Sequence, residues 1–274
     1  MIKIGTNVIM RSNGDIDLVR MNSLIFQVNL LKRAGKNVLI VTSGAVGAGM
    51  AKLHLREKPD KITLKQVCAA IGQSSLIHHY ETRFRKYGHT VAQVLLNRED
   101  LIKDYTRISL NEVLGSLLEM GVIPIINEND VISNEELIPI EQNVGWLDFS
   151  DNDGLAAALA IETKADLLIL LTDVDGLFDD YPITKTSTRI TQVERIDGKV
   201  LALAKRKGGF GRGGMRSKIN AAKNATDNGI LVVIANGQKK NIITEVMCGY
   251  NRGTLFIPIP CIRQQRGKNL KVGK

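Results

Sequence analysis

The chain has 274 residues, of which 44 % are hydrophobic and only 4 % aromatic, and its formal net charge is +9 at pH 7. This length suits one large α/β domain, or two lobes that share a sheet, with a core of Ile, Leu, Val and Ala. No apolar run reaches membrane-spanning length and no signal-peptide pattern opens the chain, so we expect a cytoplasmic protein. The three cysteines lack metal-ligand spacing, so we expect them to be reduced and to have no role in a metal site or a disulfide.

Strands and helices are expected to alternate along the first half of the chain. Apolar runs predict strands over 2–10 (with a turn at Gly5), 37–42, 90–96 and 121–126. Helical spacing of apolar residues predicts helices over 15–33, 63–87 (broken near Gly72), 104–120 and 154–163, and a further helix that opens at 43–49. Residues 131–150 are expected to form a loop or hairpin.

The second half begins with the strongest predicted strand, 165–171, and a turn over 172–178. Further along we expect a mostly irregular stretch at 179–195, helices over 197–205 and 215–228, a strand over 229–234, and a final turn and strand over 248–256. Lys207 to Gly214 holds five glycines, which predicts a mobile loop. The alternation of strands and helices predicts an α/β fold with a mostly parallel sheet.

Two clusters of short amides and carboxylates stand out, one where a predicted strand ends and one where the next helix starts. They consist of Asn127, Asn129, Asp130, Asp151, Asn152 and Asp153. Strand ends and helix starts meet at one edge of a parallel sheet, where ligands bind. Such side chains suit the capture of a zwitterion, although Asn and Asp also dominate ordinary loops and helix caps.

Three glycine-containing turns could accept an anion: Lys3–Thr6, Thr42–Ala45 and Gly211–Lys218. Small residues at a helix start leave backbone N–H groups open to a phosphate. None of the turns has the spacing of a Walker loop, and each alone could be a tight turn or a cap. Together with two lysines and the Asn/Asp clusters they favour phosphoryl transfer, which needs cations around the moving group and a held acceptor.

In this order, the motifs resemble those of the amino acid kinase family over about residues 1–257. The matching motifs are Lys3–Thr6, Val41–Ala45, Ile71–Gln73, Ile126–Asp130, Asp151–Asp153, Leu171–Asp173, Gly176–Phe178 and Gly213–Lys218. The resemblance implies a three-layer α/β/α sandwich around a mostly parallel open sheet. It also implies an acceptor-binding lobe at about 1–164 and a nucleotide-binding lobe at about 165–257. Residues 258–274 form a basic tail, too short for the PUA domain that many family members carry.

The pair of motifs at 127–130 and 151–153 is specific for the branch of the family that phosphorylates the side-chain carboxylate of L-glutamate. The activity that this implies is ATP-dependent formation of L-glutamyl 5-phosphate, the first step of proline biosynthesis. Mg²⁺ is expected to be held largely by ATP oxygens, without a protein metal site. The resemblance also implies a homo-oligomer, either dimer or tetramer, and functional coupling to a glutamate-5-semialdehyde dehydrogenase.

The same resemblance implies a role for each matching residue. Lys3 and Lys218 are expected to flank the transferred γ-phosphoryl group, with Asp153 holding both lysines. Glutamate binding is expected at Ser43, Gly44, Ala45, Asn127, Asp130, Asp151 and Asn152. Nucleotide binding is expected at Lys3, Thr172, Asp173, Arg212, Gly213, Gly214, Met215, Arg216, Ser217 and Lys218.

Two alternatives remain open from the sequence. One is a family member with a different acceptor, such as uridylate, carbamate or aspartate. The other is a basic RNA-binding protein, which the scattered positive residues and the lack of interleaved aromatics disfavour. Trp146, in the loop before Asp151, is expected to be a lid or interface anchor rather than a ligand.

Overall fold

The computed structural model describes residues 1–11, 13–133, 151–180, 183–184, 186–203 and 214–258. In these residues eight strands form a single sheet in the order β3-β4-β2-β1-β5-β7-β8-β6. Their bounds are β1 Ile2–Ile4, β2 Ile40–Val41, β3 Val91–Leu96, β4 Ile123–Glu128, β5 Leu167–Thr172, β6 Gln192–Val193, β7 Leu231–Asn236 and β8 Gly253–Phe256. Neighbouring strands are parallel except for β7 and β8. The predicted mostly parallel sheet is therefore confirmed.

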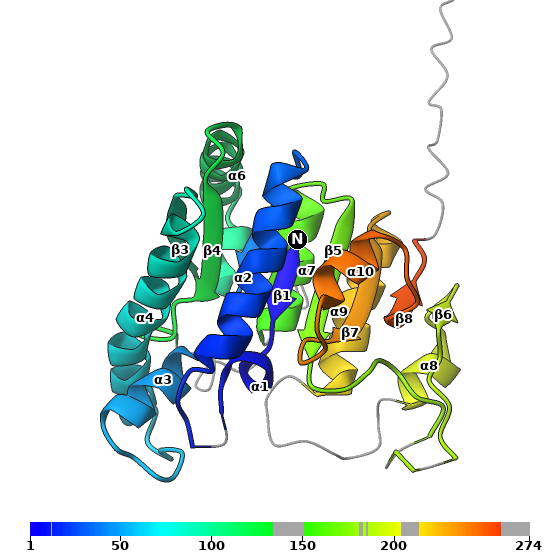
Figure 1. Ribbon diagram of the computed structural model, residues 1–274, viewed down its shortest axis with the longest axis horizontal. Helices are drawn as coiled ribbons and strands as arrows, with labels where there is room; N and C mark the ends of the chain where they lie inside the picture. The colour runs from blue at the N-terminus through cyan, green and yellow to red at the C-terminus, as the bar shows by residue number, and fades with distance from the viewer. Residues whose placement is uncertain (12, 134–150, 181–182, 185, 204–213, 259–274) are drawn as a thin grey trace, which may run out of the picture.

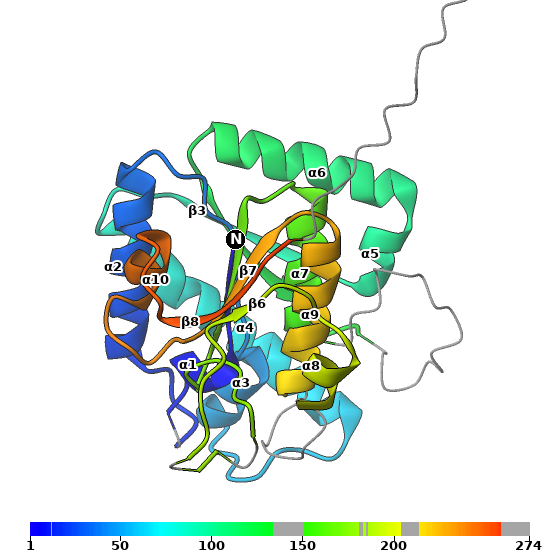
Figure 2. The ribbon, with the colours of Figure 1, turned by 90° about the vertical axis from the view of Figure 1, so that its right-hand side faces the viewer.

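Helices cover both faces of this sheet (Figure 1). One face packs against α1 (Thr6–Ile9), α2 (Leu18–Arg33), α4 (Ile62–Arg85) and α10 (Ile242–Met247). The other packs against α5 (Arg98–Ile102), α6 (Asp104–Glu119), α7 (Asn152–Glu162), α8 (Gly198–Leu203) and α9 (Met215–Asp227). Figure 2 shows α2 and α10 on one side of the strands and α7 and α9 on the other. The three-layer α/β/α sandwich is confirmed.

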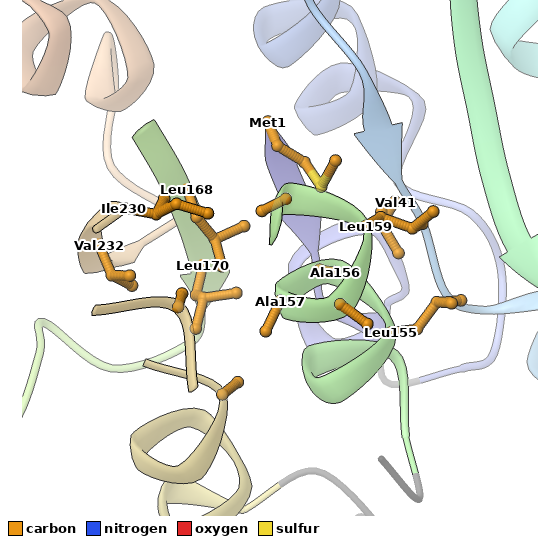
Figure 3. Packing of buried hydrophobic residues seen from close by; sticks show 14 of the residues in the cluster. Met1, Val41, Leu155, Ala156, Ala157, Leu159, Leu168, Leu170, Ile230 and Val232 are labelled. Carbon is orange, nitrogen blue, oxygen red and sulfur yellow. The ribbon is translucent and has the colours of Figure 1, made fainter. Parts of the chain in front are cut away.

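Helix α7 is the centre of its layer because it is apolar on every side. Residues 155–160 are all buried, and four of the six are alanines. A helix that is apolar all round belongs in a core, and small side chains let it lie close to its neighbours. Figure 3 shows α7 between β5, which carries Leu168 and Leu170, and β2, which carries Val41. This packing fixes where the N-terminus of α7 meets the sheet edge.

The predicted break near Gly72 is wrong, since α4 runs without interruption from Ile62 to Arg85. Gly72 instead lets α4 approach α3 (Ala45–Lys52) closely. A Cβ at position 72 would lie 1.8 Å from the Ala45 carbonyl oxygen, and one at Gly49 would lie 1.8 Å from the Cys68 carbonyl oxygen. The two glycines thus allow backbone-to-backbone contact between the helices, for which any side chain is too large.

Other differences concern short elements. The first strand ends at Ile4, just before the expected turn at Gly5, but residues 6–9 form α1, where a continuation of the strand to residue 10 was expected. The sequence also did not predict α5, α10 or β6, which have only 5, 6 and 2 residues. Such elements depend on distant partners: the Gln27 side chain accepts a hydrogen bond from the Ile243 backbone N–H at 2.7 Å, at the start of α10.

Residues 134–150 of the predicted loop 131–150, residues 207–213 of the predicted loop 207–214 and most of the predicted tail lie outside the described residues. Strands β1 to β4 form one half of the sheet and β5 to β8 the other, in one continuous hydrogen-bonded order. The division into two functional lobes at about residue 164 stays a prediction. In the described part of the chain, no helix has the length and apolar character to span a membrane.

Candidate active site

The candidate site lies where the parallel strands end and two helices begin. Lys3 is in β1, Ser43 follows β2 closely, Asn127 is near the end of β4 and Thr172 ends β5. The N-termini of α7 and α9 supply Asp151 to Asp153 and Gly214 to Lys218. The helices that follow β2 and β4 cover opposite faces, and ligands of open α/β sheets bind where the connections diverge in this way.

A buried ion cluster joins three distant parts of the chain. Lys3 Nζ lies 2.7 Å from Asp153 Oδ1, and Lys218 Nζ lies 3.0 Å from Asp153 Oδ2. The Asp153 side chain is fully buried, and the two lysine side chains are 6 % and 7 % exposed. In this cluster two positive charges face one negative charge. The cluster therefore carries a net positive charge, which suits an additional anion beside the ammonium groups.

The protonation state of Asp153 follows from its two partners. Burial favours the neutral acid, but the charges of Lys3 and Lys218 and their hydrogen bonds outweigh it, so the pKa of Asp153 lies below its usual value. Asp153 also sits in the first turn of α7, where a negative charge is stabilised by the helix dipole. The carboxylate is thus ionised at neutral pH and attracts both ammonium groups.

Next to this cluster, four polar side chains form a hydrogen-bonded chain. Asn152 Nδ2 donates to Ser43 Oγ at 2.9 Å and to Asn127 Oδ1 at 3.1 Å. Asn127 Nδ2 in turn donates to Gln73 Oε1 at 2.9 Å. Ser43, Gln73 and Asn127 are buried and Asn152 is half-buried. The chain ties α4, β4, α7 and the β2–α3 turn together at the sheet edge.

Two oxygens of the α7 N-terminus have neither a hydrogen-bond nor an ion-pair partner among the described residues. Asp151 caps the helix, its Oδ1 accepting from the backbone N–H groups of Asp153 and Gly154, while its Oδ2 is buried and unpaired. The carbonyl oxygen of Asn152, Oδ1, is also buried without a partner. Because buried acceptors are normally satisfied, these oxygens are available to a ligand that donates hydrogen bonds.

Two helix N-termini at the site lack side-chain caps. Gly214 precedes α9 without a capping side chain, and the first turn has no acidic residue but carries Arg216 and Lys218. Gly44 precedes α3 in the left-handed conformation, with φ of +104°, where a side chain would be strained. Both helices therefore present free backbone N–H groups that suit phosphate or carboxylate oxygens.

Thr172 is the last residue of β5, and Asp173 follows it. Thr172 Oγ1 donates to Asp173 Oδ1 at 3.1 Å, and the Asn7 side chain of α1 donates to Asp173 Oδ2 at 2.8 Å. Thr172 is buried and Asp173 is exposed. These contacts hold the Asp173 carboxylate in a defined position at the edge of the sheet.

The structure thus brings most of the expected residues to one edge, and it adds two that the sequence did not single out for a role. Gln73 and Asn7 could have been noticed only from the motif Ile71–Gln73 and from the closeness of Asn7 to Lys3 in the chain. Asp130 follows β4 in a turn and is half-buried. Arg212, Gly213 and Trp146 lie outside the described residues. The functional roles of all these residues stay predictions.

Comparison with known proteins identifies the class to which this arrangement belongs. The sequence profile of the amino acid kinase family matches residues 1–236, and the chain belongs to that family. Membership of a kinase family implies use of ATP.

Among its relatives, a glutamate 5-kinase of Clostridium acetobutylicum is 42 % identical over 94 % of both chains. A glutamate 5-kinase of Caldanaerobacter subterraneus subsp. tengcongensis is 43 % identical over 94 % of this chain and 68 % of its own length.

Solved structures share the fold at much lower identity. A carbamate kinase from Giardia lamblia bound to AMP-PNP has a TM-score of 0.63 and 18 % identity, covering 94 % of this chain and 97 % of its own. A UMP kinase from Ureaplasma parvum has a TM-score of 0.61 and 17 % identity, covering 93 % and 97 %. At this identity the likeness confirms the fold alone, so the acceptor must be argued from the close relatives and the site.

Proposed function

We propose that this protein transfers the γ-phosphoryl group of ATP to the side-chain carboxylate of L-glutamate and so forms L-glutamyl 5-phosphate and ADP. The observation that supports this most directly is the position of the Lys3–Asp153–Lys218 cluster beside the amide chain at Asn152. The first arrangement suits a transferring phosphoryl group and the second an amino-acid acceptor. The 42 % identical relative named a glutamate 5-kinase supports the choice of glutamate.

In the transfer step, a γ-carboxylate oxygen of glutamate attacks the γ-phosphorus of ATP. A new P–O bond forms while the bond to the β-phosphate oxygen breaks, and that oxygen leaves with ADP. The carboxylate is already ionised at neutral pH, so no general base is required. Lys3 and Lys218 neutralise the charge on the phosphoryl oxygens, and Asp153 keeps their ammonium groups in place.

Glutamate binds, in this proposal, at Ser43, Asp130 and Asn152, with Asn127 and Asp151 in support. Ser43 lies immediately before the uncapped start of α3 at Gly44 and Ala45. The backbone N–H groups of that helix start can receive a carboxylate of the substrate. Asn127 holds the Asn152 amide through the hydrogen bond at 3.1 Å, and Asp151 stabilises the helix that carries both Asn152 and Asp153.

ATP places its phosphates, in this proposal, at the N-terminus of α9 and its nucleoside near Thr172 and Asp173. Gly214 to Ser217 offer backbone N–H groups at a helix start with positive side chains in its first turn. Among the described residues, no group of three His, Cys, Asp or Glu side chains could enclose a metal ion. The ATP phosphate oxygens and water are the ligands that suit Mg²⁺ here, because this ion is commonly bound through substrate phosphates. It supplies charge neutralisation on the phosphates.

The test is a coupled assay of ADP release with glutamate, N-acetylglutamate, aspartate and UMP as acceptors, each with and without Mg²⁺. We expect turnover with glutamate and Mg²⁺ only. Turnover that does not depend on glutamate, or that is fastest with another acceptor, would overturn the assignment. Repeating the glutamate assay with proline tests whether the end product of the proposed route inhibits.

The homo-oligomer, the functional coupling to a glutamate-5-semialdehyde dehydrogenase and the cytoplasmic location stay predictions. Coupling to the dehydrogenase is chemically reasonable, because an acyl phosphate is labile in water and is protected by a closed site or a rapid next step. Size-exclusion chromatography with light scattering would measure the oligomeric state directly.

A further inference from the structure

The hydrogen-bonded chain at the acceptor site has a direction. Both N–H groups of the Asn152 amide are used, one by Ser43 and one by Asn127, and the Asn127 amide N–H points on toward Gln73. All donors therefore point away from the Asn152 carbonyl oxygen. That oxygen is buried and has no partner among the described residues.

The opposite direction is chemically available to the same residues. If the amides of Asn127 and Asn152 rotated by half a turn, Asn152 would present N–H groups where it now presents an oxygen. Ser43 does not decide between the two directions, because a hydroxyl both donates and accepts. The far end of the chain goes with the observed direction: Gln73 Oε1 accepts from Asn127 Nδ2 at 2.9 Å, and as long as Gln73 presents its oxygen, Asn127 must present its N–H group.

The direction matters for the choice of substrate. L-glutamate has two carboxylates, which accept hydrogen bonds, and one α-ammonium group, which donates them. The buried Asn152 carbonyl oxygen can accept a hydrogen bond only from the ammonium group of glutamate. If Asn152 presented its N–H groups at the same place, they would bind a carboxylate instead.

We propose that Gln73 is a positioning residue for the acceptor: it fixes the amide of Asn127, and through it the amide of Asn152, so that the Asn152 carbonyl oxygen receives the α-ammonium group of the substrate. This inference rests on the proposed function. Gln73 itself is buried on α4, and its effect on the substrate is transmitted through two other side chains.

The test compares glutamate with glutarate, which has the same two carboxylates but lacks the ammonium group. In Gln73→Met the acceptor oxygen is lost at nearly constant side-chain size. We expect the KM for glutamate to rise about ten-fold, in line with the loss of one oriented hydrogen bond. The KM for ATP and the Ki of glutarate as a competitive inhibitor should stay within about two-fold of their wild-type values, because neither ligand uses the Asn152 carbonyl oxygen.

Two further variants make the test decisive. Gln73→Glu keeps an oxygen acceptor facing Asn127, so it should retain the preference for glutamate over glutarate even if the methionine variant fails to fold. Gln93→Met is the matched control, since Gln93 is an exposed residue of β3. A parallel rise in the glutamate KM and the glutarate Ki in Gln73→Met, or loss of the preference in Gln73→Glu, would overturn the inference. Absence of glutamate-dependent turnover in the wild-type protein would instead refute the proposed function.

Discussion

Lys218 and Asp153 are 65 residues apart in the chain, yet Lys218 Nζ lies 3.0 Å from Asp153 Oδ2 in a buried contact. The other carboxylate oxygen of Asp153 contacts Lys3 at 2.7 Å. One carboxylate thus sets the separation of two ammonium groups that come from β1 and α9. We propose that the lysines act on the phosphoryl group and that the aspartate holds them. We therefore expect a lysine substitution to lower turnover and an aspartate substitution to lower stability as well.

The first prediction concerns Lys218→Ala. We expect kcat to fall about 10²–10³-fold, the range seen when one preorganised donor to a transition state is removed. The KM for glutamate should change little, because the lysine acts on the phosphoryl group. Steady-state kinetics of ADP release check both values. Lys223→Ala is the control, since Lys223 lies on the same helix and pairs with Asp227 at the surface. Activity of Lys218→Ala within a few-fold of wild type would contradict the role.

The second prediction concerns Asp153→Asn. The substitution leaves two buried ammonium groups facing a neutral amide, and breaking a buried ion pair in this way typically costs about 3–5 kcal/mol. Urea unfolding should show a loss of that order in the free energy of unfolding, together with loss of turnover. Asp227→Asn, which removes the partner of Lys223 at the surface, should change stability little. Equal stability of the two variants would show that the cluster is not a structural ion pair.

The third prediction is the pH dependence of that difference in stability. The pKa of Asp153 is lowered in the folded protein, so at low pH the unfolded chain takes up the proton first. The stabilisation by Asp153 is therefore fully present above the pKa of an unfolded aspartate, about 3.9, and is lost as pH falls through the lower folded value. Urea unfolding between pH 7 and 3 should give a constant gap between wild type and Asp153→Asn down to about pH 5. The gap should then narrow; a gap that widens toward low pH would contradict the sign.

The fourth prediction concerns Gly72→Ala on α4. The added Cβ would lie 1.8 Å from the Ala45 carbonyl oxygen, so α3 must move away. We expect a loss of about 3 kcal/mol or more in stability, at the upper end for overpacking, and a raised KM for glutamate because Ser43 to Ala45 shift. Gly115→Ala on α6 is the matched control, since a Cβ there meets nothing within 4 Å. That change should be neutral or stabilise by up to about 1 kcal/mol, and a similar melting temperature for the two variants would contradict the packing argument.

The local sequence was sufficient for the long elements and for the residue types of the site. An apolar run such as Leu167–Thr172 can only be buried, and the spacing in Leu18–Arg33 forms one apolar face whatever the rest of the chain does. Asn127 to Asp130 and Asp151 to Asp153 could likewise be assigned to strand ends and helix starts from their neighbours. The order of the motifs then indicated the family, and comparison with known proteins confirmed it.

Other features depended on contacts between distant residues. A glycine within a helix pattern, such as Gly72, serves equally for a break or for a close approach, and only the position of Ala45 decides which. The same holds for Lys3 and Lys218. The sequence by itself determined that both lysines adjoin glycine-containing turns, whereas the sheet order β2-β1-β5 and the packing of α7 against α9 decided that they meet at Asp153. Ion pairing of Asp153 with two lysines so distant in the chain is a property of the folded core, because only burial brings the ammonium groups and the carboxylate together away from water.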